Sequence, residues 1–293
     1  MSVLIVNRPG FQTLLQDQGR QGSQRAGLTE GGAADQHAYR WANKLLDNGN
    51  NAACLEILMG QFDATVTDDV LIAVTGADLA FTINGKAAEN WSSHWLQAGD
   101  KIAFNRPLSG LRAYLAVAGG WQTPQCFGSR SVVIREHLGG LDGGPIKAGD
   151  RLVFNEQQRQ AQRQLAPQYI PDYQADLTLQ VVPGYQYAEF SGLDRRRFTS
   201  SRYTISNQID RMGYRLKGPI IVPKIDGVIS EGIAMGAVQV PRDGQPIVLL
   251  RDRQTIGGYP KIGCVSSLCC SKLSQRGPGA QVTFEFAELA DLQ

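Results

Sequence analysis

The sequence predicts a mainly β protein with few short helices, and three observations support this. The chain of 293 residues contains 33 glycines and 13 prolines, a content typical of many tight turns. Hydrophobic residues make up 42% and charged residues 19%, which is the balance of a globular chain with a buried core. Short apolar runs follow one another with few helical patterns between them, and this favours antiparallel barrels or sandwiches.

One clear helix is expected near the N-terminus, in DQHAYRWANKLLDN. Asp35 is its candidate N-cap, and apolar residues recur behind it at helical spacing. Short strands are expected from there to about residue 155. Between two of them, Asn84 and Gly85 predict a type I′ hairpin turn, because this pair accepts positive φ angles.

A short pattern occurs twice, as QAGDKIAF at 97–104 and KAGDRLVF at 147–154. Each copy has a turn that ends in Ala-Gly-Asp, then a basic residue and a strand. A looser copy, GPGAQVTFEF, stands at 277–286. The pattern suggests a β-barrel element that is used more than once.

The segment between Asn155 and Asp176 is rich in glutamine and arginine and contains two prolines, which is typical of a linker. Strand patterns resume behind it, one of them in GVISEGIAMGAVQV. We therefore expect a domain boundary near residue 165. The N-terminal β subdomain, with the early helix, covers 1–165, and the C-terminal β-barrel subdomain, with the main motif, covers 166–293.

Charge and cysteine content exclude several classes of function. The net charge is +2 and the charges are scattered, so no footprint for nucleic acid is present. No run approaches the roughly 20 apolar residues of a membrane span or has the form of a signal peptide, and we expect a cytoplasmic protein. The five cysteines lack a CxxC pair or a histidine at ligand spacing, which predicts reduced core thiols and no metal site. The basic run Arg195–Arg197 is interpreted as a solvated loop.

Nucleotide and hydrolase motifs are also absent. The sequence has no GxxxxGK[ST] and no GxGxxG between a strand and a helix, so this chain by itself provides no ATP or dinucleotide pocket. Its three histidines stand outside any GxSxG or HExxH context, which gives little support to a serine triad or a zinc hydrolase.

The stretch LLRDRQTIGGYPKIG, residues 249–263, is the strongest candidate site. Asp252 and Gln254 would share one face of an extended segment. Gly257 and Gly258 could turn consecutive backbone N–H groups toward an anion. Tyr259 is biased toward extended geometry by the proline that follows it.

Three further segments carry candidate residues. In ISEGIAMGAVQVPRDGQPIVLL, Glu231 could act as a general base if burial raises its pKa, or could be a structural acceptor, and Gln239 alternates with valines. In SNQIDRMGYRL, Asp210 and Arg211 precede a glycine, and function and bracing are both open for them. Asp17 and Arg20, in LLQDQGRQG, could clamp a carboxylate or brace their loop by a salt bridge.

These segments together resemble the KipA family, whose members are also called allophanate hydrolase subunit 2 or the C subunit of 5-oxoprolinase. The resemblance is carried by QDQGRQG, GGAADQHAYRWANKLL, VTGADLAFTINGK, RAYLAVAGGWQTPQCFGSRS, DRMGYRL and SEGIAMGAVQVPRDGQPIVLLRDRQTIGGYPKIG. The chain departs from the usual wording at Tyr185, where Gly-Pro-Gln is common, and at Ala280, where an aspartate is usual.

The resemblance implies a cyclophilin-like β-barrel architecture in two subdomains and an enzyme of several subunits. The partners would be two further proteins, one KipI-like (B) and one LamB/YcsF-like (A), and the complex would use ATP to open 5-oxoproline (pyroglutamate) to glutamate. Two alternatives stay open: the carboxyltransferase component of a urea/allophanate-type biotin-dependent system, and a non-catalytic regulator of a sensor kinase inhibitor. In the first function, the candidate catalytic residues are Glu231, Asp252 and Asp210. The candidate substrate- or anion-binding residues are Arg211, Gln239, Gln254, Thr255, Gly257, Gly258, Tyr259, Asp17 and Arg20.

Overall fold

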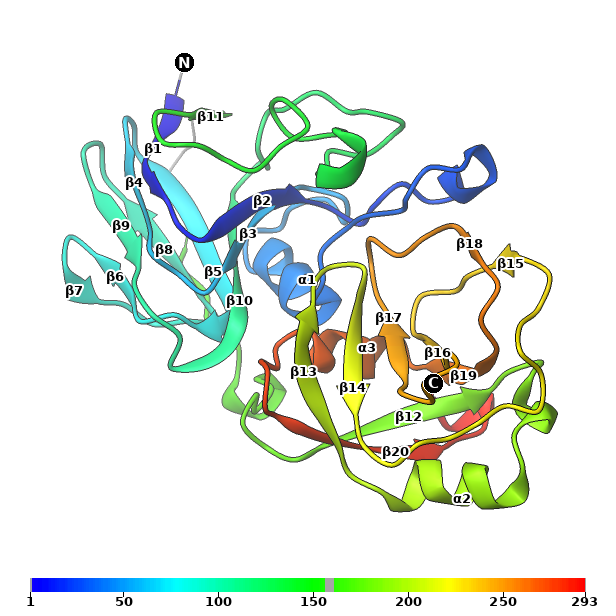
Figure 1. Cartoon of the computed structure of the whole chain (residues 1–293). Helices are drawn as coiled ribbons and strands as arrows, with labels where there is room; N and C mark the ends of the chain where they lie inside the picture. The colour runs from blue at the N-terminus through cyan, green and yellow to red at the C-terminus, as the bar shows by residue number, and fades with distance from the viewer. Residues whose placement is uncertain (1, 156–160, 293) are drawn as a thin grey trace. The chain divides into compact units, whose positions relative to one another are not determined.

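A computed structural model describes residues 2–155 and 161–292, and the chain divides into two compact units (Figure 1). The first unit consists of Met1–Ser23 and Glu30–Gln174, and the second of Gln24–Thr29 and Ala175–Gln293. Residues 156–160 of the expected linker lie outside the described residues. The domain limits 1–165 and 166–293 stay a prediction.

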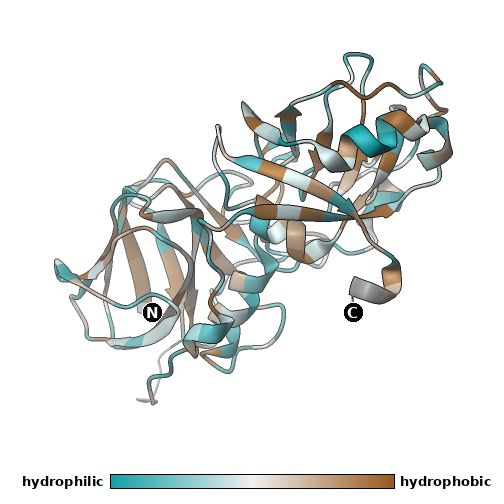
Figure 2. Ribbon diagram, turned by 90° about the horizontal axis from the view of Figure 1, so that it is seen from below, coloured by the Kyte–Doolittle hydropathy of each residue, from teal (hydrophilic) through white to brown (hydrophobic). Residues whose placement is uncertain are grey.

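The first unit contains two antiparallel sheets. The six-stranded sheet has the order β11 (Arg151–Phe154), β1 (Ser2–Pro9), β4 (Phe62–Val66), β9 (Lys101–Phe104), β6 (Phe81–Ile83) and β7 (Lys86–Ala87). The five-stranded sheet has the order β2 (Gln12–Gln16), β3 (Cys54–Leu58), β10 (Ser109–Val117), β5 (Val70–Asp78) and β8 (Ser92–Leu96). Both sheets contribute side chains to one apolar core, and Figure 2 shows hydrophobic residues along the strands and mostly hydrophilic connections.

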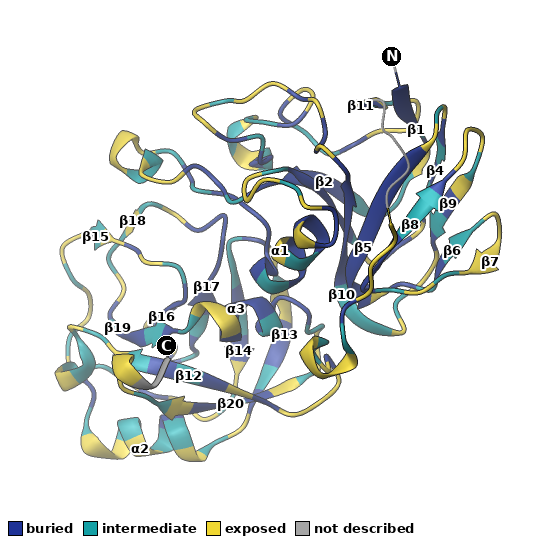
Figure 3. Ribbon diagram, turned by 180° about the vertical axis from the view of Figure 1, so that it is seen from behind, coloured by how far each residue is buried: buried dark blue, intermediate teal, exposed yellow. Residues whose placement is uncertain are grey.

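Helix α1 (Gln36–Lys44) covers the second face of the five-stranded sheet. The side chain of Asp35 accepts a hydrogen bond from the backbone N–H of Ala38, as expected for an N-cap. Tyr39 and Ala42 of the helix pack with residues of β5 and β10 in a second apolar cluster. Strand β5 is therefore buried on both faces, which explains its continuous apolar run (Figure 3).

The predicted hairpin is confirmed between β6 and β7. Asn84 has a φ of 52° and Gly85 a φ of 75°, the positive values that a type I′ turn requires.

The second unit is a closed seven-stranded barrel. Its strands follow one another in the order β12 (Leu177–Pro183), β19 (Lys261–Val265), β16 (Ala237–Gln239), β17 (Ile247–Leu249), β14 (Gly213–Lys217), β13 (Tyr203–Ile209) and β20 (Gln281–Phe286). Strands β15 (Glu231–Gly232) and β18 (Ile256–Gly257) form a separate two-stranded ribbon that is not part of the barrel. The mainly β fold with a barrel and few short helices is thus confirmed.

Two helices pack against the barrel. Helix α2 (Gly192–Ser200) stacks Phe198 on Phe284, with ring centroids 4.1 Å apart. Helix α3 (Ser267–Leu273) buries both of its cysteines in the barrel core. Five 3-10 helices complete the described elements: η1 (Ser23–Ala26), η2 (Ile134–Glu136), η3 (Pro167–Tyr169), η4 (Tyr187–Glu189) and η5 (Leu289–Leu292). Within the described ranges, no helix is long and apolar enough to cross a membrane.

Two expectations for the second unit were wrong. The run Arg195–Arg197 belongs to helix α2 and not to a loop, because Ser191 caps the helix by accepting from the N–H of Asp194. The stretch GVISEGIAMGAVQV forms two short strands, β15 and β16, instead of one. Gly236 separates them with a φ of 84°, which a regular strand does not accommodate.

The repeated pattern has one geometry in all three copies. Gly99, Gly149 and Gly279 have φ angles of 89°, 89° and 87°. Each donates its N–H to the carbonyl oxygen of a strand residue: Gly99 to Val66 at 2.8 Å, Gly149 to Val6 at 2.7 Å, and Gly279 to Ile205 at 2.9 Å. The element is therefore used twice in the first unit and once in the second.

One difference separates the third copy from the other two. Asp100 accepts a hydrogen bond from the N–H of Gln97 at 2.7 Å, and Asp150 accepts one from the N–H of Lys147 at 2.8 Å. The third copy has Ala280 at this position, and its methyl group cannot accept from the N–H of Gly277.

We predict that Ala280→Asp stabilises the second unit by about 0.5–1.5 kcal/mol, because it adds the hydrogen bond that the other copies contain. The measurement is hydrogen exchange in increasing urea, followed on peptides of β13 and β20. Asp150→Ala is the matched control and should destabilise the first unit by a similar amount, followed by tryptophan fluorescence. If Asp150→Ala lowers the stability of the first unit but Ala280→Asp does not raise that of the second, the three turns are not equivalent.

Candidate functional site

The ribbon brings two of the predicted segments together. Glu231 lies opposite Gly257, and Gly232 opposite Ile256. The pairing continues on both sides, where the N–H of Ile233 donates to Thr255 at 3.1 Å and the N–H of Val228 donates to Gly258 at 2.8 Å. Residues 228–233 and 255–258 therefore form one structural feature.

A polar cluster stands at the base of this ribbon. Glu231 Oε1 lies 2.6 Å from Lys261 Nζ and accepts a hydrogen bond from Gln186 Nε2 at 2.9 Å. Gln186 Oε1 in turn accepts from the backbone N–H of Lys261 at 3.3 Å. The side chain of Glu231 is 38% exposed and that of Lys261 is 12% exposed, so a ligand that approaches from solvent meets the carboxylate first.

The environment of Glu231 lowers its pKa. The hydrogen bond from Lys261 is the largest cause, while burial raises the pKa by less. The condition under which Glu231 was expected to act as a general base, a pKa raised by burial, is therefore not met, and the carboxylate is ionised at neutral pH. Lys261 was missed because a lone lysine at the start of a strand has no distinctive sequence pattern.

The glycine pair does not form the predicted N–H turn. Neither Gly257 nor Gly258 has a positive φ, and Gly257 belongs to strand β18. Both positions instead lack room for a side chain. A Cβ atom at Gly257 would lie 2.7 Å from Ile233 Cδ1 and 3.0 Å from Gln239 Nε2, and one at Gly258 would lie 2.9 Å from the carbonyl oxygen of Val228.

The remaining residues of the stretch 249–263 separate into buried and exposed groups. The segment turns at Leu250–Arg253, where the N–H of Arg253 donates to Leu250 at 3.3 Å. Asp252 is buried and Gln254 is exposed, so the expectation that they share one face was wrong. Gln239 is buried beside Gly257, Thr255 is half-buried, and Tyr259 is 48% exposed.

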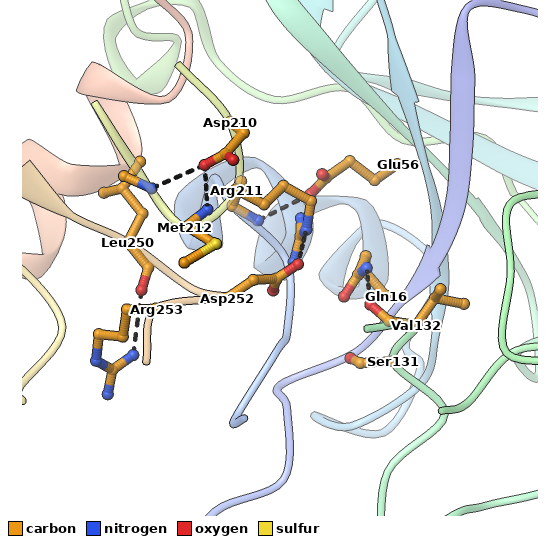
Figure 4. A network of polar contacts seen from close by, with 12 residues as sticks. Gln16, Glu56, Ser131, Val132, Asp210, Arg211, Met212, Leu250, Asp252 and Arg253 are labelled. Carbon is orange, nitrogen blue, oxygen red and sulfur yellow. Dashed lines mark hydrogen bonds and ion pairs between the residues drawn. The ribbon is translucent and has the colours of Figure 1, made fainter. Parts of the chain in front are cut away.

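Asp252 forms a buried bidentate pair with Arg211. Arg211 Nε donates to one carboxylate oxygen at 2.9 Å and Nη2 to the other at 3.0 Å (Figure 4). Asp210 has a different function in the same loop, where Oδ1 accepts from the N–H groups of Met212 at 2.7 Å and Gly213 at 3.1 Å. These contacts fix the turn that precedes β14.

Asp17 and Arg20 belong to the first unit and are fully buried. Asp17 Oδ1 accepts from the hydroxyl groups of Ser129 and Ser131, both at 2.6 Å, and Oδ2 accepts from the N–H of Arg130 at 2.6 Å. Arg20 donates to the carbonyl oxygens of Cys126 at 3.1 Å and Ser131 at 2.5 Å. Both residues therefore brace their loop against the segment 126–131 by hydrogen bonds, and among the described residues no salt bridge joins Asp17 to Arg20.

A cavity of about 700 Å³ opens beside the ribbon in the second unit. It is lined by Arg215, Asp226, Pro241, Arg242, Asp243, Ile247, Gly258 and Tyr259. Only the last two were predicted. The four charged residues were missed because they come from three loops or strands that are far apart in the sequence.

All five cysteines are free thiols. Burial raises the pKa of the Cys264 and Cys270 thiols, which keeps these two protonated. Among the residues that the structure describes, no group of three or more histidine, cysteine, aspartate or glutamate side chains is placed to hold a metal ion.

Two kinds of sequence comparison agree on the family. A family model described as "Carboxyltransferase domain, subdomain A and B" matches residues 26–286. The chain is 37% identical to the C subunit of 5-oxoprolinase from Escherichia coli (strain K12) over 286 residues, which are 96% of this chain and 90% of that protein. It is 32% identical to the C subunit of 5-oxoprolinase from Haemophilus influenzae over 279 residues, 94% of this chain and 89% of that protein.

Solved structures extend the comparison. The crystal structure of TTHA0988 matches with a TM-score of 0.86 and 30% identity over 97% of this chain, which spans 56% of that chain. The urea amidolyase structure of K. lactis matches with a TM-score of 0.88 over 98% of this chain and 19% of that one, and at 24% identity this likeness concerns the fold alone.

We predict that Lys261→Met raises the pKa of Glu231 toward its ordinary value of 4.5. The measurement is a ¹³C NMR titration of the Glu231 carboxyl carbon, assigned by its absence in Glu231→Gln. Because the folded pKa lies below the ordinary one, the pair stabilises the fold above about pH 4.5, and this contribution is lost as the pH falls through the folded pKa. The stability difference between wild type and Lys261→Met should therefore vanish in acid, and an unchanged Glu231 titration would contradict the pairing.

We predict that Asp252→Asn destabilises the second unit by about 3 kcal/mol, because it removes the buried charge opposite Arg211. Asp243→Asn is the matched control, and it should cost no more than about 1 kcal/mol because both members of the Arg215–Asp243 pair are partly exposed. Hydrogen exchange of β14 peptides in urea measures both. Equal stability of Asp252→Asn and wild type would show that Asp252 is not a structural residue.

Proposed function

The chain belongs to the family described as "Carboxyltransferase domain, subdomain A and B", and we propose that it is the C subunit of a 5-oxoprolinase. The observation that carries this proposal is its likeness to two bacterial proteins of that name over nearly their whole lengths. A likeness confined to one domain of a larger enzyme would be weaker support, because one fold serves many activities.

The reaction would open the lactam ring of 5-oxoproline to glutamate. The lactam C–N bond breaks, the oxygen of water forms a new bond to the carbonyl carbon, and the nitrogen becomes an amine. A lactam carbonyl is a poor electrophile, and coupling to ATP would activate its oxygen. The enzyme would then need a cation or N–H donor near that oxygen and a carboxylate near the attacking water.

The Glu231–Lys261 pair has the groups that this chemistry needs. Lys261 Nζ could stabilise negative charge on the substrate, and the ionised Glu231 could orient the attacking water. Since Glu231 is partly exposed, a ligand can reach it without disrupting the barrel. We keep Gln239, Thr255 and Tyr259 as proposed binding positions. Gly257 and Gly258 are proposed to keep the ribbon free of side chains that would meet its neighbours, and Gly258 lines the cavity. The other predicted residues are assigned bracing roles, except the exposed Gln254, which remains a candidate.

ATP use is assigned to the complex and not to a site on this chain. The sequence lacks a phosphate-binding loop, and the cavity beside the ribbon is lined by two arginines and two aspartates, whose formal charges cancel. A polyphosphate favours a surplus of positive charge or a nest of N–H groups. We therefore propose two partner proteins, one KipI-like and one LamB/YcsF-like, that complete the enzyme, and we expect the isolated chain to be inactive.

The family description also fits a second function, carboxyl transfer from a biotin carrier. The chain contains no Met-Lys-Met segment that would carry biotin, so a separate carrier would have to supply it. Restoration of carboxyl transfer by an added biotinylated carrier would favour this alternative, and inhibition of a kinase without turnover would favour the regulator.

The test is reconstitution with candidate KipI-like and LamB/YcsF-like partners and measurement of ATP-dependent glutamate formation, with each component omitted in turn. We expect activity only when all three are present, and Glu231→Gln should lower kcat by about 10²-fold, because the attacking water loses its orientation. Arg196→Gln, a change of an exposed residue on α2, is the control and should retain full activity. Full activity without this chain would refute the function, and full activity of Glu231→Gln would remove that residue from the site.

A further inference from the structure

The cavity beside the ribbon has walls that are held by backbone contacts of the barrel. One wall is the turn between β16 and β17, closed by the hydrogen bond from the N–H of Gly244 to Pro241 at 2.9 Å. A second wall is β14, where Arg215 lies opposite Ile247 of β17, so both side chains share one face of the sheet. The third wall contains Gly258 and Tyr259. The carbonyl oxygen of Gly258 accepts from the N–H of Val228, and next to Tyr259 the N–H of Val240 donates to the carbonyl oxygen of Pro260 at 2.9 Å.

One pair of charges in the cavity is already neutralised. Arg215 donates to Asp243 in an ion pair. Asp243 also accepts a hydrogen bond from the N–H of Gln245 at 3.2 Å. The side-chain amide of Gln245 accepts from the N–H of Gly218 at 2.8 Å and donates to the carbonyl oxygen of Gly218 at 3.1 Å. This arrangement fixes the pair as part of the wall.

Three other polar groups in the cavity belong to exposed side chains and have no partner among the described residues. Arg242, Asp226 and the hydroxyl of Tyr259 make no hydrogen bond or ion pair with any residue that the structure describes. They differ in chemistry: a guanidinium, a carboxylate and a phenol. Ile247 and Pro241 add apolar surface between them.

We propose that this cavity binds a small molecule that has one carboxylate, one N–H donor and one carbonyl acceptor, which is the class of 5-oxoproline. Arg242 binds the carboxylate, Asp226 accepts from the N–H group, and the Tyr259 hydroxyl donates to the carbonyl oxygen. This assignment rests on the proposed function. Each of the three polar groups of the ligand then meets a group of complementary hydrogen-bonding chemistry.

The charges of the cavity side chains disfavour a polyphosphate ligand. Asp226 and Asp243 would face its negative oxygens, and only one of the two arginines is unpaired. The volume of about 700 Å³ lies in the ordinary range for small-molecule sites, roughly 300–1,000 Å³. It exceeds what a single lactam fills, which leaves space for water beside the substrate.

The test uses the complex reconstituted from all three proteins. Arg242→Gln should raise KM for 5-oxoproline by about tenfold or more with kcat within threefold, because a guanidinium–carboxylate contact is lost from the bound state. Arg242→Lys should recover part of this loss. Asp226→Asn and Tyr259→Phe should raise the same KM by smaller factors, and the KM for ATP should not change in any variant. Arg196→Gln is the control for loss of an exposed arginine.

The outcomes distinguish failure of the cavity proposal from failure of the proposed function. An active complex in which both Arg242→Gln and Asp226→Asn leave KM for 5-oxoproline unchanged would overturn the cavity proposal while the proposed function stands. A rise in KM for ATP instead of 5-oxoproline would also overturn it. Wild-type components that produce no glutamate would refute the proposed function itself, and the cavity assignment with it. Thermal unfolding of each variant confirms that a changed KM is not caused by misfolding.

Discussion

Closure of the seven-stranded barrel is the constraint on which the candidate site depends. Strand β12 pairs in parallel with β20, from Leu177 opposite Val282 to Val181 opposite Phe286. Because a closed barrel has no unpaired edge, strands β16 and β17 keep their positions with only three residues each. The long loops that carry Glu231, Tyr259 and the cavity residues therefore begin and end at fixed points, which is how rigid scaffolds present functional loops.

Features that depend on neighbouring residues could be predicted from the sequence. The cap at Asp35, the Asn84-Gly85 hairpin and the Ala-Gly-Asp turns each rest on hydrogen bonds or φ angles within about four residues. The mainly β fold follows from many such local patterns in series. The likeness of the ordered motifs to one family supplied the barrel architecture, which local patterns alone leave open between barrel and sandwich.

Features that depend on distant partners could not be predicted. The pKa of Glu231 is set by Lys261, thirty positions away, and the sequence offers no sign of their contact. The glycine pair predicts a turn of consecutive N–H groups, whereas in the structure its lack of Cβ atoms matters. Asp252 is a candidate catalytic residue in the sequence, which gives no sign that Arg211, from another loop, pairs with it.

Pairing of charges decides which residues can serve a ligand. A buried pair such as Arg211–Asp252 is costly to break, so neither member can readily turn to a substrate. The Glu231–Lys261 pair is exposed on one side only: the carboxylate of Glu231 is open to a ligand group, whereas Lys261 Nζ is buried from solvent and stays next to Glu231. Among the described residues, Arg242 and Asp226 have no partner, so a ligand at the proposed cavity site can bind them without breaking an existing ion pair. A ligand anchored by these two groups would lie next to Gly258 of the ribbon, whose carbonyl oxygen already accepts from the N–H of Val228.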